Sequence, residues 1–468
     1  MARPLLCPAP GRPKVRLLFS PAMTSAGGRA TTLHEGARQG VILILYYSLR
    51  PRLRANLADH LYAFRRYSGR RCVYINLAIR SIPAWVDRIG VDLVVFQTLL
   101  LSTRWDPPTF RRVRARLAPI RRLSCTKVAQ PQDEFIYTDP LVEFIREFEV
   151  DYVLACAPQT EWRTIYGSLL DGPTSFIPVL TGYLDPATIE RITRMASNGP
   201  RGIDVGYRAS RPSFSLGRHG QLKPRIGEVV ADAAPAAGLR ADISMQEEDT
   251  LNGDDWYRFL LDCRWVIGVE GGASLLDRDG SLRSRTRAFL AEHPNASFEE
   301  VEEACFPGLD GGLKLFAISP RHLEACATRT AQALVEGTYD GILDAGVHYL
   351  PVARDFSNLD EVLRDMSNEE LRTRLAERAH ADIVGSGRYT YPAFIRELMA
   401  SLPRTEPIRT GAAARALAAW DDWLDGPSWS LVWARARLRR SIRSMLSRVG
   451  LLEAFLRYRA AARARAEG

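Results

Sequence analysis

The segment Val41-Ile-Leu-Ile-Leu-Tyr-Tyr47 decides how the chain folds, because it is a short apolar run without a charged residue. Such a run is typical of a strand in a parallel sheet that helices cover on both faces. A helical pattern follows, in which Leu57, Leu61 and Phe64 recur at spacings of four and three residues. The segment therefore predicts the first strand and helix of an α/β domain.

The same alternation of strand and helix continues in two series. Apolar strand patterns lie at 73–75, 92–96, 127–129, 152–155 and 176–179, and then, after a helix at 186–196, at 203–205, 241–243, 265–269, 332–335 and 348–352. This order predicts an α/β protein with two doubly wound, Rossmann-like domains facing a cleft. We expect a poorly ordered extension at 1–40, an acceptor-side domain at 41–195, a second domain at 196–400 and a helical tail at 401–468.

The length and composition exclude several classes of protein. The 468 residues are 46% hydrophobic and 25% charged, which is globular, and no apolar run approaches the roughly 20 residues of a membrane-spanning helix. The seven cysteines are scattered without a metal-binding spacing, and no secretory leader is evident. We therefore expect a cytoplasmic protein.

The formal charge of +9 is concentrated at the two ends of the chain. Residues 1–40 carry 6 basic and 1 acidic side chains, residues 401–468 carry 13 and 6, and the middle is mildly acidic. A nucleic-acid-binding core needs a positive stripe on the folded body, so this function is disfavoured. In the tail, 427–460 form a basic amphipathic pattern that fits an anionic membrane surface, and thus a peripheral location at the inner face. The alternative is a helix that packs on the body or on a partner.

The segment Ile318-Ser-Pro-Arg-His-Leu-Glu324 predicts a helix start, with Ser319 as N-cap and a proline at the first helical position. A helix N-terminus attracts phosphate, and Arg321 and His322 in its first turn either contact such a ligand or flank the cap. Glu324 follows in the second turn.

The segment Glu324-Ala-Cys-Ala-Thr-Arg-Thr-Ala-Gln-Ala-Leu-Val335 resembles the Glu-Ala-Met-Ala-x-Gly-x-Pro-Val-Val region of nucleotide-sugar-dependent glycosyltransferases with the GT-B fold. The wider blocks 319–358 and 388–394 are similar to the family-1-like, spore-maturation glycosyltransferase-like branch. The resemblance covers residues 200–400 well, and over residues 41–200 it extends only to the layout of strands and helices. It implies that Glu324 bonds the ribose hydroxyls of a nucleotide. The family has a second glutamate eight positions earlier, where this chain has Phe316.

The resemblance also implies that Arg208 and Lys223, near the strand at 203–205, neutralise the diphosphate of the donor. General electrostatics agrees, since fixed cations stabilise charge that develops on a leaving phosphate. The alternative is that both are ordinary surface cations. Glu270, Gly271 and Gly272 follow the strand at 265–269, where glycines let the backbone approach a donor closely.

On the acceptor side, three residues are candidates for the base that deprotonates an acceptor hydroxyl. Asp133 and Glu134 follow the strand at 127–129, and His60 lies in the first helix. The alternative for Asp133 and Glu134 is an exposed acidic loop without a catalytic role, and the alternative for His60 is an ordinary histidine on a helix face. The Asp277-Arg-Asp-Gly280 segment matches a metal-binding pattern but is also an ordinary turn, and we expect no metal.

These observations predict a metal-independent, hexosyltransferase-type glycosyltransferase, with a nucleotide sugar as substrate, no cofactor and an unidentified acceptor. Two alternatives stay open. One is a nucleotide-sugar epimerase on the same fold. The other is a GT-B protein without catalytic activity, which serves as a binding or assembly protein.

Overall fold

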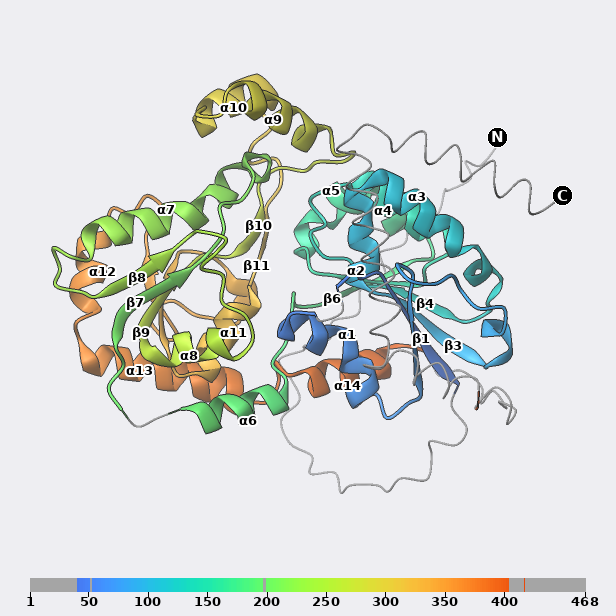
Figure 1. Cartoon of the computed structure of the whole chain (residues 1–468), viewed down its shortest axis with the longest axis horizontal. Coiled ribbons are helices and arrows are strands. Elements are labelled where there is room, and N and C mark those ends of the chain that lie inside the picture. Colours follow the sequence, from blue (N-terminus) through green and yellow to red (C-terminus); the bar gives the residue numbers. More distant parts are fainter. Residues whose placement is uncertain (1–39, 51–52, 197–198, 404–415, 417–468) are drawn as a thin grey trace, which may run out of the picture.

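In a computed structural model that describes residues 40–50, 53–196, 199–403 and 416, the chain folds around two parallel sheets. Each sheet has helices on both faces, and the two α/β domains lie side by side (Figure 1).

The N-terminal sheet has six parallel strands in the order β2-β1-β3-β4-β5-β6. They are β1 (Val41–Tyr46), β2 (Cys72–Asn76), β3 (Val91–Phe96), β4 (Thr126–Ala129), β5 (Tyr152–Ala155) and β6 (Ser175–Pro178). Every residue of β1 is buried, as its unbroken apolar pattern predicts. Ile44 pairs with Tyr74 on one side and Val95 on the other, so β1 is an inner strand.

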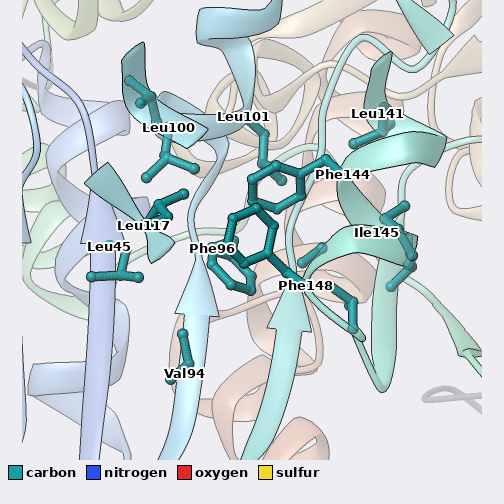
Figure 2. Close-up of a cluster of buried hydrophobic side chains, with 14 of the residues drawn as sticks. Leu45, Val94, Phe96, Leu100, Leu101, Leu117, Leu141, Phe144, Ile145 and Phe148 are labelled. Carbon is teal, nitrogen blue, oxygen red and sulfur yellow. The ribbon is translucent and has the colours of Figure 1, made fainter. Parts of the chain in front are cut away.

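The helices of this domain are α1 (Ala55–Tyr67), α2 (Thr98–Leu101), α3 (Pro107–Arg116), α4 (Thr138–Glu147), α5 (Trp162–Tyr166) and α6 (Pro186–Met195). Figure 2 shows one face of the core, where Phe96 of β3 meets aromatic residues of α4 and its C-cap. The ring of Phe144 lies edge-on to Phe96 at 5.0 Å, and Phe148 lies 4.6 Å from Phe144. Aromatic pairs in such geometry add to the stabilisation that burial alone provides.

The C-terminal sheet has five parallel strands in the order β13-β12-β9-β7-β8. They are β7 (Ile203–Arg208), β8 (Ala241–Ser244), β9 (Cys263–Gly268), β12 (Ala331–Val335) and β13 (Leu350–Val352). The main helices around it are α7 (Gly217–Ala233), α8 (Asp254–Asp262), α11 (Pro320–Ala327), α12 (Leu359–Asp365) and α13 (Glu369–Ala379). The strand order reverses between β7 and β9, and such a switch point is where doubly wound sheets bind ligands.

An insertion not anticipated from the sequence joins the two domains. The short antiparallel pair β10 (Gly271–Ala273) and β11 (Leu315–Ala317) carries α9 (Ser281–Glu292) and α10 (Phe298–Cys305) between its strands. Asp277 of this insertion exchanges backbone hydrogen bonds with the N-terminal domain, donating to Phe135 O at 2.8 Å and accepting from Tyr137 N at 2.7 Å. The Asp277 carboxylate accepts hydrogen bonds from Gly280 N and Leu282 N at the start of α9. These are the bonds of an ordinary turn, one of the two readings of the Asp277–Gly280 segment.

A second contact between the domains comes from α14 (Tyr391–Ser401), which lies against α1 (Figure 1). The hydroxyl of Tyr391 lies 3.3 Å from Nδ1 of His60, and Leu184 N donates to Tyr389 O at 2.9 Å. The helix α14 therefore returns from the C-terminal domain to the N-terminal one.

The predicted fold class is confirmed: two Rossmann-like domains in contact, the arrangement that a GT-B fold requires. The proposed extension (apart from Gly40) and the basic stretch 427–460 lie outside the described residues. Within the described part, no helix has the length and apolar character needed to span a bilayer.

Candidate functional site

A cavity of about 200 Å³ lies at the switch point of the C-terminal sheet. The carboxyl ends of β7 and β9 form one side of it, and the start of α11 forms another. Five of the nine predicted donor-binding residues line it, namely Arg208, Lys223, Ser319, Arg321 and His322. We call it the cationic cavity, because three of these five side chains carry a fixed positive charge. Parallel strands end at one edge of their sheet, which is why residues far apart in sequence meet here.

Arg208 and Arg321 form one wall of the cationic cavity. The Arg208 guanidinium bonds Asp242 at 2.8 Å and lies over the ring of Phe259. Arg321 donates to the carbonyl oxygen of Arg208, and its guanidinium lies over the indole of Trp256 at 5.1 Å. Arg208 is thus paired with a carboxylate, whereas Arg321 has no carboxylate within ion-pair distance in the described part of the chain.

Lys223 lies in the first turns of α7 and differs from the two arginines. Among the described residues its ammonium has no hydrogen-bond or ion-pair partner, and it is only partly exposed. Burial and the nearby charge of Arg321 lower its pKa, whereas Asp133 acts in the opposite direction. A partly desolvated cation without a partner favours binding of an anion.

Asp133 lies beyond the end of β4 in the N-terminal domain, near enough to Lys223 for the two charges to interact. Its side chain is solvent-exposed, but the surrounding protein partly desolvates the carboxyl and raises its pKa, while Arg104 and Lys223 oppose the rise. Its backbone has a φ of 51°. The fully buried Arg104 holds this loop by donating to the carbonyl oxygens of Gln132 and Asp133, both at 2.8 Å. Arg104 thus fixes the backbone of the loop that carries Asp133, and Asp133 itself does not line the cationic cavity.

The other two candidate bases lie elsewhere. Glu134 is fully buried inside the N-terminal domain, where it accepts from Tyr166 Oη at 2.7 Å and Cys156 N at 3.1 Å. Burial raises its pKa to about 7. His60 is buried at the contact with α14, and burial lowers its pKa to about 4. None of the three candidate bases lines the cationic cavity.

His322 and Ser319 line the cavity in different ways. Nδ1 of His322 lies 3.0 Å from Gln332 Oε1, and Nε2 lies 3.3 Å from Val269 O. Burial lowers its pKa to about 4, so it is a neutral wall residue rather than a cation. A side chain at Gly268 would lie 2.9 Å from His322, which explains the glycine there. Ser319 occupies the N-cap position of α11 without a side-chain capping bond.

The structure places Glu270, Gly271 and Gly272 outside the cationic cavity. Glu270 is buried and accepts from Tyr339 N at 2.6 Å and from both Thr338 N and Thr338 Oγ1, so it holds the loop after β12. Gly272 has a φ of 113° and a Cβ there would lie 1.9 Å from Leu315 O. The glycine is thus required by the β10–β11 pairing.

Glu324 also lies outside the cationic cavity. Its carboxylate accepts a hydrogen bond of 2.8 Å from Nε1 of Trp256, and burial raises its pKa to about 7. It lines a second cavity of about 220 Å³ between the domains, together with His60. A third cavity of about 130 Å³ shares Trp256 and Arg321 with the first and Glu324 with the second.

Several residues near the site carried no sequence signal. Trp256 and Asp242 lie in an ordinary helix and strand, and only their contacts single them out. Phe316, which stands where the family has a glutamate, stacks on His219 at 3.7 Å, and Arg354 Nη2 lies 3.4 Å from His219 Nδ1. Within the described ranges, no group of three or more His, Cys, Asp or Glu side chains is arranged to hold a metal ion.

No protein-family model matches this sequence, and no curated protein matches it either. Solved structures do match. The Anabaena protein HepE in complex with UDP and glucose is 13% identical, with 78% of this chain and 100% of that chain covered and a TM-score of 0.40. A glycosyltransferase from Rickettsia africae is 9% identical, covering 77% and 97% with a TM-score of 0.40. The sucrose-phosphate synthase of Thermosynechococcus elongatus is 13% identical, covering 78% and 100% with a TM-score of 0.39.

Proposed function

We propose that this protein transfers a sugar from a nucleoside-diphosphate sugar to a hydroxyl group of an acceptor. The observation that carries the proposal is the cationic cavity, where Arg208, Lys223 and Arg321 meet at the switch point of a doubly wound sheet. Three fixed cations match the charge of a diphosphate, and an unpartnered ammonium gains the most from such a ligand.

The proposed chemical step assigns a role to each of the charged groups. Asp133 accepts the proton of the acceptor hydroxyl, and the oxygen forms a bond to the anomeric carbon of the donor. The bond from that carbon to the β-phosphate oxygen breaks, and its electron pair stays on the phosphate. Lys223 and Arg208 stabilise this charge, so the step is proposed to need no divalent metal. The raised pKa of Asp133 makes it a stronger base than an aspartate with the ordinary pKa.

The ribose role of Glu324 stays a prediction. In the described conformation its carboxylate is engaged by Trp256. Contact with a nucleotide in the cationic cavity therefore requires Trp256 to move or the ligand to extend into the third cavity, which Arg321 and Glu324 both line.

A second candidate is a protein that binds a nucleotide sugar without transferring it. Phe316 favours this reading, because an aromatic stack with His219 replaces the carboxylate that the family pattern has at this position. A nucleotide-sugar epimerase is the third reading, and it alone interconverts donor sugars in the absence of an acceptor.

The test is calorimetric titration of the full chain with UDP, GDP, ADP and TDP. At least one should bind, and Lys223→Met should weaken that binding roughly tenfold or more, because a charge-assisted contact is lost. Lys314→Met is the matched control, since Lys314 is exposed and does not line the cavity. If no nucleotide binds, or if both variants bind alike, the proposal fails.

A further inference from the structure

One short segment of the β10–β11 insertion contacts both domains. We call this segment, residues 274–280, the interdomain strut. Its first residue bonds the C-terminal domain, since Ser274 N donates to Leu216 O at 3.0 Å and Ser274 Oγ accepts from His219 N at 3.2 Å. Leu216 is the N-cap of α7 and His219 lies in its first turn, and the same helix carries Lys223. The strut is thus bonded to the helix that supplies the ammonium group of the cationic cavity.

Three residues later the strut pairs with the loop that carries Asp133. Asp277 N donates to Phe135 O at 2.8 Å, and Tyr137 N donates to Asp277 O at 2.7 Å. These two bonds form a parallel bridge between Asp277 and Ile136. Main-chain hydrogen bonds have a narrow range of lengths, so the bridge holds the strut at a fixed distance from the loop.

Apolar packing attaches the insertion to the N-terminal domain as well. Ala273, directly before the strut, is fully buried, and so are Leu313 and Leu315 on the returning chain. All three belong to the same hydrophobic cluster as Phe135 and Tyr137 of the N-terminal domain. The insertion therefore contributes to the core of the N-terminal domain, although its two ends continue into the C-terminal one.

Gly280, the last residue of the strut, shows how closely the two segments fit. Its φ is 86°, and a Cβ there would lie 2.1 Å from Cζ of Tyr137, so the tyrosine ring packs directly on the glycine. Tyr137 itself has a φ of 50°. A residue other than glycine keeps such a conformation only where surrounding contacts hold it. The strut provides contacts of this kind to the loop of Asp133.

We propose that the interdomain strut positions Asp133 relative to Lys223, with Asp277 and Tyr137 as positioning residues for the proposed transfer. Asp133 and Lys223 belong to different domains, so the distance between them depends on how the domains are joined. The strut joins them directly, because Ser274 bonds the helix of one and Asp277 bonds the loop of the other. The effect on the rate rests on the proposed function, whereas the placement of the two side chains does not.

The placement is tested by NMR on the full chain with ¹³C-labelled lysine, because the chain has only four lysines and Lys223→Met identifies one signal. The charge of Asp133 raises the pKa of Lys223. Asp133→Asn should therefore lower the midpoint of the Lys223 titration, by about 0.5 pH unit or more. Gly280→Ala, which displaces the Tyr137 ring, should lower it similarly, and the double variant should lower it no further. Gly311→Ala is the matched control, since Gly311 lies in the same insertion with a φ of 82° and a Cβ there would meet no described atom within 4 Å.

Steady-state kinetics test the effect on the rate. Gly280→Ala should lower kcat roughly tenfold or more while the nucleotide Kd changes less than about twofold, because orientation of the base is lost and the cationic cavity is kept. Gly311→Ala should leave both quantities unchanged. Tyr137→Ala, which removes the ring without adding an atom, should act like Gly280→Ala and serves if that variant does not fold. Tyr137→Phe, which keeps the ring, should restore most of the rate.

Three results would overturn the proposal. The first is a Lys223 titration that Asp133→Asn does not change. The second is a Lys223 titration that Asp133→Asn changes but that is the same in Gly280→Ala, Tyr137→Ala and Gly311→Ala. The third is loss of nucleotide affinity equal to the loss of kcat, which would make the strut a support of the donor site. A native chain without transferase activity would refute the proposed function, and the NMR titration alone would then decide on the strut.

Discussion

The indole Nε1 of Trp256 donates a hydrogen bond of 2.8 Å to Oε2 of Glu324. The guanidinium of Arg321 lies over the same indole, at 5.1 Å from its centre. Glu324, Trp256, Arg321 and Arg208 therefore form a chain of contacts, in which Trp256 and Arg321 lie between Glu324 and Arg208. Burial raises the pKa of the Glu324 carboxyl to about 7, whereas the Trp256 hydrogen bond and the charge of Arg321 oppose the rise.

Glu324→Gln should change how stability depends on pH. Burial raises the pKa of Glu324 from about 4.5 to about 7, so its proton is bound more tightly by the folded state. Its contribution to stability is therefore complete below pH 4.5 and is lost as the pH rises through 7. Glutamine does not titrate, so the variant does not lose this stability. Between pH 5 and pH 8 its free energy of unfolding should therefore rise by about 2–3 kcal/mol relative to that of the native chain.

Urea denaturation of both proteins at the two pH values measures this gain, and the comparison cancels the effect of other titrating groups. Gln keeps an oxygen that can accept from Trp256. A difference that stays the same at pH 5 and pH 8 would contradict the raised pKa.

Asp133→Asn should separate catalysis from binding. Loss of the base should lower kcat by about 10²–10⁴ if the proposed transfer is correct. Nucleotide affinity should stay the same or rise, because the variant removes a negative charge that interacts with Lys223. Steady-state kinetics and calorimetry give the two quantities, with the exposed Asp87→Asn as control. Weaker nucleotide binding with unchanged kcat would reassign Asp133 to the donor site.

Arg104→Met should destabilise the N-terminal domain. Arg104 is fully buried and donates to four carbonyl oxygens, those of Leu101, Gln132, Asp133 and Ile136. A thioether leaves these acceptors without a donor, and we expect a loss of about 3 kcal/mol or more in the free energy of unfolding. Thermal and urea denaturation measure it, with exposed Arg111→Met as the control. Equal stability of the two variants would show that the loop before Asp133 does not need Arg104.

The segment 427–460, which lies outside the described residues, carries a prediction of its own from the sequence. If it binds an anionic membrane surface, the full chain should bind vesicles that contain phosphatidylserine, and salt should weaken the binding. A chain that ends after Pro403 should not bind vesicles but should keep nucleotide binding, since the cationic cavity lies before that point. Co-sedimentation at low and high salt tests this. Vesicle binding that survives the truncation would assign it to another surface.

The sequence by itself determined the two sheets and much of the cationic cavity. Unbroken apolar runs such as Val41–Tyr46 specify buried parallel strands through local pattern alone. Arg208 ends a strand of the parallel sheet, and parallel strands all end at one edge, where ligands bind. Arg321 lies in the first turn of a helix that follows β11 of the antiparallel pair, so its place beside Arg208 depends on that insertion. The β10–β11 insertion escaped this reasoning, since strands of three residues leave no periodic signal.

Only the tertiary structure decided which cavity each side chain serves. Asp133 and Glu134 are neighbours in sequence, yet the first is exposed and interacts with the charge of Lys223, whereas the second is buried and bonded to Tyr166. Glu324 turns toward Trp256, and His60 meets a tyrosine that is 331 residues away. These outcomes depend on the rotation of each helix and on how two separately folded domains dock. Such contacts are formed between segments distant in the chain, so no local pattern of residues encodes them.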